Sequence, residues 1–127
     1  MTSRFDQLPS ALRRHGYLDR LGSTGVPALL VPAESGLPHG PLVIWLHGRT
    51  AYKELDPGRY LRLIRSGISV CAVDLPGHGE RSSPQLQESA QVLDVVLQMV
   101  QELVYVTEAA VERLNADPNR IGVGGMS

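Results

Sequence analysis

The chain has 127 residues, of which 43% are hydrophobic and 20% are charged, and its formal net charge is -1. This composition is typical of a single globular domain over residues 1–127 and excludes a disordered or fibrous chain. The near-neutral charge, without a run of Lys or Arg, gives no electrostatic basis for binding nucleic acid or a membrane surface. No apolar stretch approaches the roughly 18 residues that a spanning helix needs, and the N-terminus lacks the apolar core of a signal peptide. We therefore expect a cytoplasmic protein.

The first part of the chain predicts a helix and then a strand. Residues 7–15 favour a short helix, with Pro9 near its start and Gly16 after its end. Residues 26–32 are strand-like, but the run contains two prolines. Because proline has no N–H for a strand ladder, we expect an edge strand or a short strand here.

Three largely apolar runs predict the central strands of a sheet. They cover residues 41–48, 68–73 and 120–123. A continuous apolar run is typical of a strand whose two faces are both covered by helices, which favours a parallel sheet. The single cysteine, Cys71, lies in the second run, so we expect a buried and inert thiol.

A helix is predicted between the first two of these strands. Asp56 followed by Pro57 is a typical helix start, and Gly67 is a typical helix end. Between them Tyr60, Leu61 and Ile64 fall on one helical face, which we expect to contact the core.

A second and longer helical segment begins at Ser83 and Pro84 and ends within residues 115–119. It forms one helix or two, since Asp94 is able to cap a new one. Apolar residues recur along it in steps of three and four, and we expect this stripe to contact the core. The stripe consists of Leu86, Ala90, Leu93, Leu97, Val100, Val104, Val111 and Leu114. Strands that alternate with helices in this order predict the α/β class, with a mostly parallel sheet and flanking helices.

The end of the chain carries a pattern with chemical meaning. Residues 117–127, DPNRIGVGGMS, run from a polar turn through a short apolar segment and glycines to a serine. Gly125, Met126 and Ser127 match the first half of the nucleophile elbow G-x-S-x-G, in which a sharp turn after a strand exposes a serine hydroxyl. Small neighbours let the backbone bend and a following helix pack closely. Half a motif is weak alone, so its weight depends on the segments upstream.

Two further motifs follow the other central strands. Residues 47–50 read HGRT and residues 74–79 read DLPGHG. Functional groups in open α/β sheets collect at the carboxyl ends of the strands. In this order the three motifs resemble the N-terminal half of an α/β-hydrolase, over roughly residues 25–127. Residues 117–127 resemble most the dienelactone-hydrolase and prolyl-oligopeptidase-like branches of that family.

The resemblance implies a nucleophile and an oxyanion donor, with His47, Gly48 and Gly125 as supporting residues of the motifs. Ser127 matches the nucleophile, which attacks an acyl carbonyl to form an acyl-enzyme. The backbone N–H of Arg49, directly after His47 and Gly48, matches one donor of the oxyanion hole, and Gly125 belongs to the elbow. The implied protein is a serine carboxylesterase-like hydrolase that acts on a small-molecule ester or related acyl substrate. In this family the second oxyanion donor, the catalytic acid and the catalytic histidine follow the serine.

The remaining polar residues of these motifs have structural interpretations. We assign His47 and His78 to hydrogen bonds within their loops, and Asp74 to nearby backbone groups. The Arg49 side chain either reaches an anionic substrate group, forms a salt bridge or faces solvent. We expect no cofactor, and because no Cys/His/Asp cluster has metal-ligand spacing, we expect no metal site.

Two other classes of function stay open. One is a non-catalytic protein on a hydrolase-like fold, since a fold does not fix a function. The other is a nucleotide-binding oxidoreductase, suggested by Gly122, Gly124 and Gly125. Its G-x-G-x-x-G loop would need glycine where Ser127 stands. We also expect the domain to be incomplete at its C-terminus, as one piece of a protein of roughly 200–300 residues whose C-terminal part would be its partner.

Overall fold

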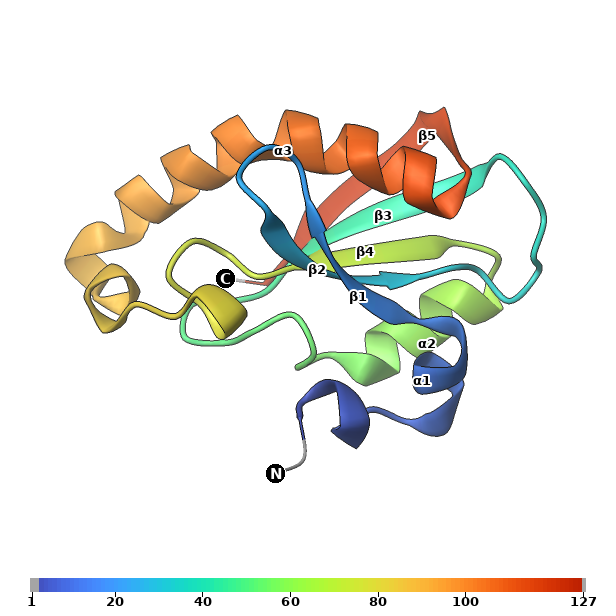
Figure 1. Cartoon of the computed structure of the whole chain (residues 1–127), viewed down its shortest axis with the longest axis horizontal. Helices are drawn as coiled ribbons and strands as arrows, with labels where there is room; N and C mark the ends of the chain where they lie inside the picture. The colour runs from blue at the N-terminus through green and yellow to red at the C-terminus, as the bar shows by residue number, and fades with distance from the viewer. Residues whose placement is uncertain (1–2, 127) are drawn as a thin grey trace.

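The computed structural model of the chain describes residues 3–126, and Ser127, the nucleophile expected from the sequence, lies outside the described residues (Figure 1). Within the described part, five strands form one sheet in the order β1-β2-β4-β3-β5. The strands are β1 (Tyr17–Leu21), β2 (Val26–Val31), β3 (Gly40–Leu46), β4 (Ser69–Val73) and β5 (Ala116–Gly125). Helix α3 (Val92–Leu114) crosses one face of the sheet, and α1 (Ser10–His15) and α2 (Pro57–Arg65) lie on the other (Figure 1). Four single turns of 3-10 helix complete the described elements: η1 (Phe5–Gln7), η2 (Gly79–Arg81), η3 (Pro84–Gln87) and η4 (Ser89–Gln91).

The predicted α/β class and the parallel pairing of the three strands are confirmed, but among the described residues β5 lies at an edge of the sheet and is mostly exposed, not central and covered. Strand β3 pairs in parallel with β4 on one side and β5 on the other. Helices α2 and α3 supply the crossover connections that parallel neighbours require. The whole sheet is mixed, however, because β2 pairs antiparallel with both β1 and β4.

The sequence predicts an edge strand or a short strand over residues 26–32, and the structure shows the second: β2 is a strand of six residues inside the sheet. Strand β2 has neighbours on both sides, and all six of its residues are buried. Pro27 is only the second residue of the strand and Pro32 lies beyond its end, so neither interrupts the pairing between them. On this side of the described sheet the edge strand is β1, which is not predicted from the sequence.

Helix boundaries differ from the predictions in their first turns. Helix α1 begins at Ser10, after Pro9, rather than at residue 7. Asp56 does precede α2, but its carboxylate accepts a hydrogen bond from Arg59 Nε at 2.8 Å and caps no backbone N–H. The start signal at Ser83 and Pro84 opens the turns η3 and η4, and the long helix α3 follows as one piece from Val92.

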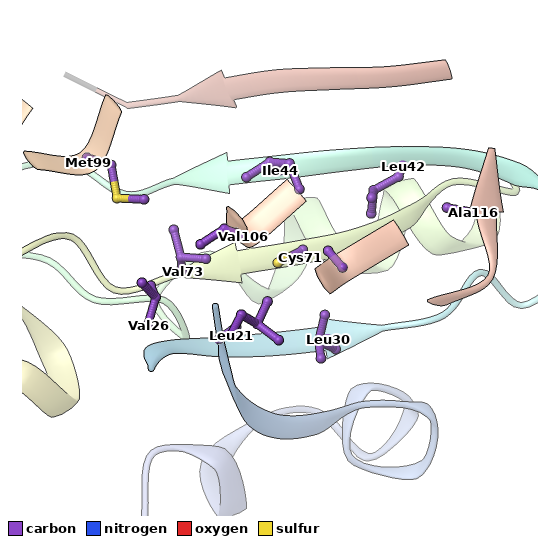
Figure 2. Packing of buried hydrophobic residues seen from close by; sticks show 12 residues of the cluster. Leu21, Val26, Leu30, Leu42, Ile44, Cys71, Val73, Met99, Val106 and Ala116 are labelled. Carbon is purple, nitrogen blue, oxygen red and sulfur yellow. The ribbon is translucent and has the colours of Figure 1, made fainter. Parts of the chain in front are cut away.

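Two hydrophobic clusters cover the faces of the sheet. The cluster under α3 joins Leu21, Leu30, Ile44, Cys71 and Val73 of the strands to Met99 and Val106 of the helix (Figure 2). Cys71 is fully buried, as predicted, and burial raises the pKa of its thiol to about 12, so the thiol is unreactive. The second cluster packs α1 and α2 against the opposite face, through Leu12, Tyr60, Ile64, Val70 and Ala72.

The predicted core stripe of the long helix is wrong in its middle, although Val111 and Leu114 near the end of the helix do pack against the core. Leu93, Leu97, Val100 and Val104 are between 52% and 66% exposed. The buried residues of α3 are Val95, Met99, Glu102, Val106 and Ala110. Helix α3 therefore has two apolar stripes, and the one that faces the sheet contains a charged residue. None of the helices in residues 3–126 combines the length and the hydropathy needed to cross a membrane.

The orientation of α3 is tested by one substitution made on each of its faces. We expect Val106→Ala, which removes a fully buried side chain, to lower the free energy of unfolding by about 2 kcal/mol. Val104→Ala, at a position that is 60% exposed, should change it by less than about 0.5 kcal/mol. Urea unfolding measures both variants. Equal losses would contradict the orientation of the helix.

Candidate active site

The segments that carry the three motifs predicted from the sequence leave the sheet at the same end, where the parallel strands β3, β4 and β5 have their carboxyl ends. Leu46, the last residue of β3, lies opposite Val73 of β4 and Gly125 of β5 in the strand register. The Met126 N–H donates to the Leu46 carbonyl at 3.0 Å, which continues the pairing beyond β5. The segments that begin at residues 47 and 74 therefore leave the sheet beside Gly125 and Met126.

A cavity of about 360 Å³ opens at this edge. Its lining is mainly apolar and comes from the loops after β3 and β4, from η3 and from the start of α3. The lining residues are His47, Arg49, Leu75, His78, Leu86, Val92, Val95, Val96 and Met126. Arg49 Nη1 donates to the Gln87 carbonyl at 3.2 Å, which joins the loop after β3 to η3 across the cavity.

The two histidines of the motifs are structural, as the sequence predicts. His47 Nδ1 lies 2.7 Å from the Gly48 carbonyl, and its Nε2 accepts the Leu75 N–H at 3.0 Å. His78 Nδ1 lies 2.9 Å from the Pro76 carbonyl, and its Nε2 accepts the N–H of Thr50 at 3.0 Å. Each ring therefore carries its proton on Nδ1 and uses Nε2 as an acceptor. Neither ring has a nitrogen available to take a proton from a serine.

The Asp74 side chain contacts both of these loops. It is fully buried, and its Oδ2 accepts the Glu80 N–H at 3.0 Å, a backbone contact of the kind predicted. The strongest partner was missed: Lys53 donates its N–H to Oδ1 at 3.0 Å and its Nζ to Oδ2 at 2.9 Å. A Cβ at Gly79, where φ is +56°, would overlap the Asp74 carboxylate. Asp74 thus fixes the path of both loops.

The Arg49 backbone lies between these anchored groups. Thr50, the next residue, has a φ of +67°, a backbone conformation that persists only where the surroundings enforce it. Within residues 3–126 the Arg49 N–H has no hydrogen-bond acceptor. Because Arg49 is exposed, this N–H is a candidate donor to a group outside the described residues. Among the same residues, no group of three or more His, Cys, Asp or Glu side chains is arranged to hold a metal ion.

No protein-family model and no curated protein matches the chain, but solved structures do. The Thermus thermophilus protein TT1662 is 26% identical with a TM-score of 0.66, over 88% of this chain and 47% of its own. A Klebsiella pneumoniae structure named as a dienelactone hydrolase is 20% identical with a TM-score of 0.69, over 87% and 49%. A hyperthermophilic esterase from Pyrobaculum calidifontis is 22% identical with a TM-score of 0.59, over 86% and 34%. The chain spans less than half the length of each of these structures.

The contact of Asp74 with Gly79 is tested by comparing two glycines that both have positive φ. Gly36 has a φ of +65° with open space around it, so Gly36→Ala should cost only the backbone strain, about 1 kcal/mol. Gly79→Ala adds the overlap with the carboxylate and should cost at least about 2 kcal/mol more. Urea unfolding of both variants measures the difference. Equal costs would show that the carboxylate does not depend on this glycine.

A pH dependence follows from His47. Burial disfavours the charged ring and lowers the pKa of His47 below its ordinary value of 6.5. At this site the folded protein then binds fewer protons than the unfolded chain. The stability that His47 contributes is therefore complete above pH 6.5 and is lost as the pH falls through the folded-state pKa.

His47→Gln isolates this effect, because Gln is able to accept the Leu75 N–H but gains no proton. We expect the native protein to lose stability relative to the variant as the pH is lowered from about 7.5 to about 5. Urea unfolding at several pH values measures the difference between the two proteins. A difference that is constant over this range would contradict the lowered pKa.

Proposed function

We propose that this chain, which has the α/β-hydrolase fold, carries the nucleophile and one oxyanion donor of a serine hydrolase that cleaves carboxylic ester bonds. One observation supports the proposal above the others. The N–H of Met126, the residue before Ser127, is hydrogen-bonded to Leu46 at the end of β3. Arg49, whose N–H has no acceptor within residues 3–126, lies three residues after Leu46 in the chain. The G-x-S pattern and the strand register therefore support the assignment of the expected nucleophile to the strand end where a candidate oxyanion donor and a cavity lie.

The proposed reaction is acyl transfer in two steps. The Ser127 hydroxyl attacks the ester carbonyl while a base takes its proton, and negative charge develops on the carbonyl oxygen. The Arg49 N–H donates to that oxygen. Collapse of the tetrahedral intermediate breaks the bond to the leaving alcohol, which receives the proton, and water then releases the acid in the same way. His47 and His78 are both occupied as acceptors, so the resemblance assigns the base to a histidine that follows the serine.

The lining of the cavity indicates the substrate class. A volume of about 360 Å³ with walls from Leu75, Leu86, Val95 and Val96 suits a short aliphatic or aromatic group better than a charged one. We therefore propose small carboxylic esters as substrates. The Pyrobaculum calidifontis structure with the same fold is an esterase, which is consistent with this class.

A fluorophosphonate probe tests the nucleophile in the full-length protein. We expect its intact mass to rise by one probe unit, with the adduct mapped to Ser127, because only an activated serine reacts rapidly. Ser127→Ala should abolish labelling and lower the turnover of p-nitrophenyl acetate by at least about 10⁴-fold.

Ser35→Ala is the matched control, since Ser35 is exposed in the loop before β3, away from the cavity. It should label and turn over as the native protein does. Ester hydrolysis that persists in the Ser127→Ala variant would contradict the serine mechanism. A folded native protein that neither labels nor turns over esters would favour the non-catalytic alternative.

A further inference from the structure

The sequence contains a single lysine, and the structure buries it. Lys53 lies in the segment between β3 and α2 and is 1% exposed. Every other residue with a permanently cationic side chain is an arginine. An ammonium group removed from water is strongly destabilising unless charged partners surround it. The position of Lys53 therefore needs an explanation in its contacts.

Three carboxylates surround the ammonium group. Lys53 Nζ contacts Asp74 Oδ2 at 2.9 Å, Glu54 Oε2 at 3.3 Å and Glu80 Oε2. Burial alone would lower the pKa of Lys53, but the hydrogen bonds to Glu80 and Asp74 outweigh it and raise the pKa, so the group is charged. A lysine ammonium has three N–H donors, which matches the three acceptors, whereas the planar fork of an arginine does not.

The backbone of Lys53 is hydrogen-bonded through both its N–H and its carbonyl. Its N–H donates to Asp74 Oδ1 at 3.0 Å, and its carbonyl accepts the hydroxyl of the fully buried Tyr60 at 2.7 Å. Asp74 and Glu80 belong to the loop after β4, and Tyr60 belongs to α2. Lys53 therefore joins the loop after β3 to two other elements.

The same loop after β4 also holds the residue next to the oxyanion donor. His78, which lies between Asp74 and Glu80 in the chain, accepts the Thr50 N–H. The Ala51 N–H donates to the Gly48 carbonyl at 3.1 Å, which closes a tight turn around Arg49 and Thr50. A movement of the loop after β4 relative to Lys53 would therefore move the Arg49 peptide group through His78.

We propose that Lys53 is a positioning residue for catalysis, whose ammonium group holds the loops after β3 and β4 together and thereby sets the position of the Arg49 N–H. The proposal rests on the hydrolase function proposed above. Without Lys53, Asp74, Glu54 and Glu80 would face one another with no ammonium between them, and like charges repel strongly when buried. The guanidinium of Arg81 does not replace it, because it bonds the Asp74 carbonyl and Glu102 instead.

Glu54 shares the cluster in a different way. Burial raises the pKa of Glu54, although Lys53 acts in the opposite direction, and its Oε1 has no hydrogen-bond partner among the described residues. The ammonium group lies closer to Asp74 and Glu80, which stand on either side of His78 in the chain, than to Glu54. These two contacts tie the ion cluster to the turn that carries the oxyanion donor.

The test compares Lys53→Met with native full-length protein, using p-nitrophenyl acetate and active sites counted by stoichiometric fluorophosphonate labelling. We expect kcat per active site to fall by about 10-fold to 100-fold, because loss of a whole oxyanion donor costs about 10²–10³-fold. KM should stay within about threefold, since the donor acts on the transition state. The affinity of phenylboronic acid, whose adduct places an oxygen in the oxyanion hole, should weaken by the same factor as kcat.

Arg65→Met is the matched control. It removes an equal charge from an exposed ion pair, Arg65 Nε to Glu34 Oε1 at 4.0 Å, at the C-terminal end of α2. Neither residue lines the cavity. We expect kcat within about twofold of native, since exposed pairs contribute little. If Lys53→Met does not fold, Glu80→Gln serves instead, because Glu80 is half-exposed and Gln retains an acceptor. It should lower kcat by about threefold, again without a change in KM.

Each outcome decides between the two proposals. A kcat per active site that stays within about twofold of native in Lys53→Met or Glu80→Gln would overturn the positioning role while leaving the hydrolase intact. A rise in KM with unchanged kcat would overturn it too. A native protein that neither labels nor hydrolyses esters would overturn the proposed function itself, and the role of Lys53 with it.

Discussion

The loops at the carboxyl edge of the sheet depend on the hydrogen bonds of one buried carboxylate. Asp74 is removed from water, and a buried charge is tolerated only when its oxygens are fully paired. Lys53 and the Glu80 N–H satisfy it, and Gly79 leaves room for it. Around this centre, the neutral rings of His47 and His78 accept backbone N–H groups that have no partner in the sheet. Irregular backbone is thereby made rigid at the place where a reaction needs fixed donors.

Much of this edge could be predicted from the sequence, because it follows from chain order. The apolar runs that became β3 and β4 predict covered, parallel strands, and their ends must then meet. Lys53 could not be predicted, since a lysine beside a glutamate in a polar segment resembles a solvated surface. Its partners Asp74 and Glu80 come from the following loop, 21 and 27 residues away. Strand β1 was missed because four of its five residues are exposed or only partly buried.

The orientation of α3 could not be predicted because its buried stripe is the more polar of its two stripes and its exposed stripe is the more apolar. The inward stripe contains Glu102, which pairs with Arg81 at 2.9 Å and accepts a hydrogen bond from Thr24. This ion pair lowers the pKa of Glu102 despite the burial of its side chain. The outward stripe contains only apolar residues, so periodicity alone favours the wrong face. Glu102 connects the helix to η2 and thus to the loop after β4.

The burial of the only lysine in the sequence has a consequence for the surface chemistry of residues 3–126. Between residues 3 and 126 the folded protein presents no primary amine to solvent, because the basic groups on its surface are guanidinium and imidazole groups. Acylating reagents, and enzymes that modify lysine, reach Lys53 only when the loops after β3 and β4 separate. Acylation at this residue removes its positive charge and so traps the separated state. The rate of acylation of Lys53 therefore reports how often the loops after β3 and β4 separate.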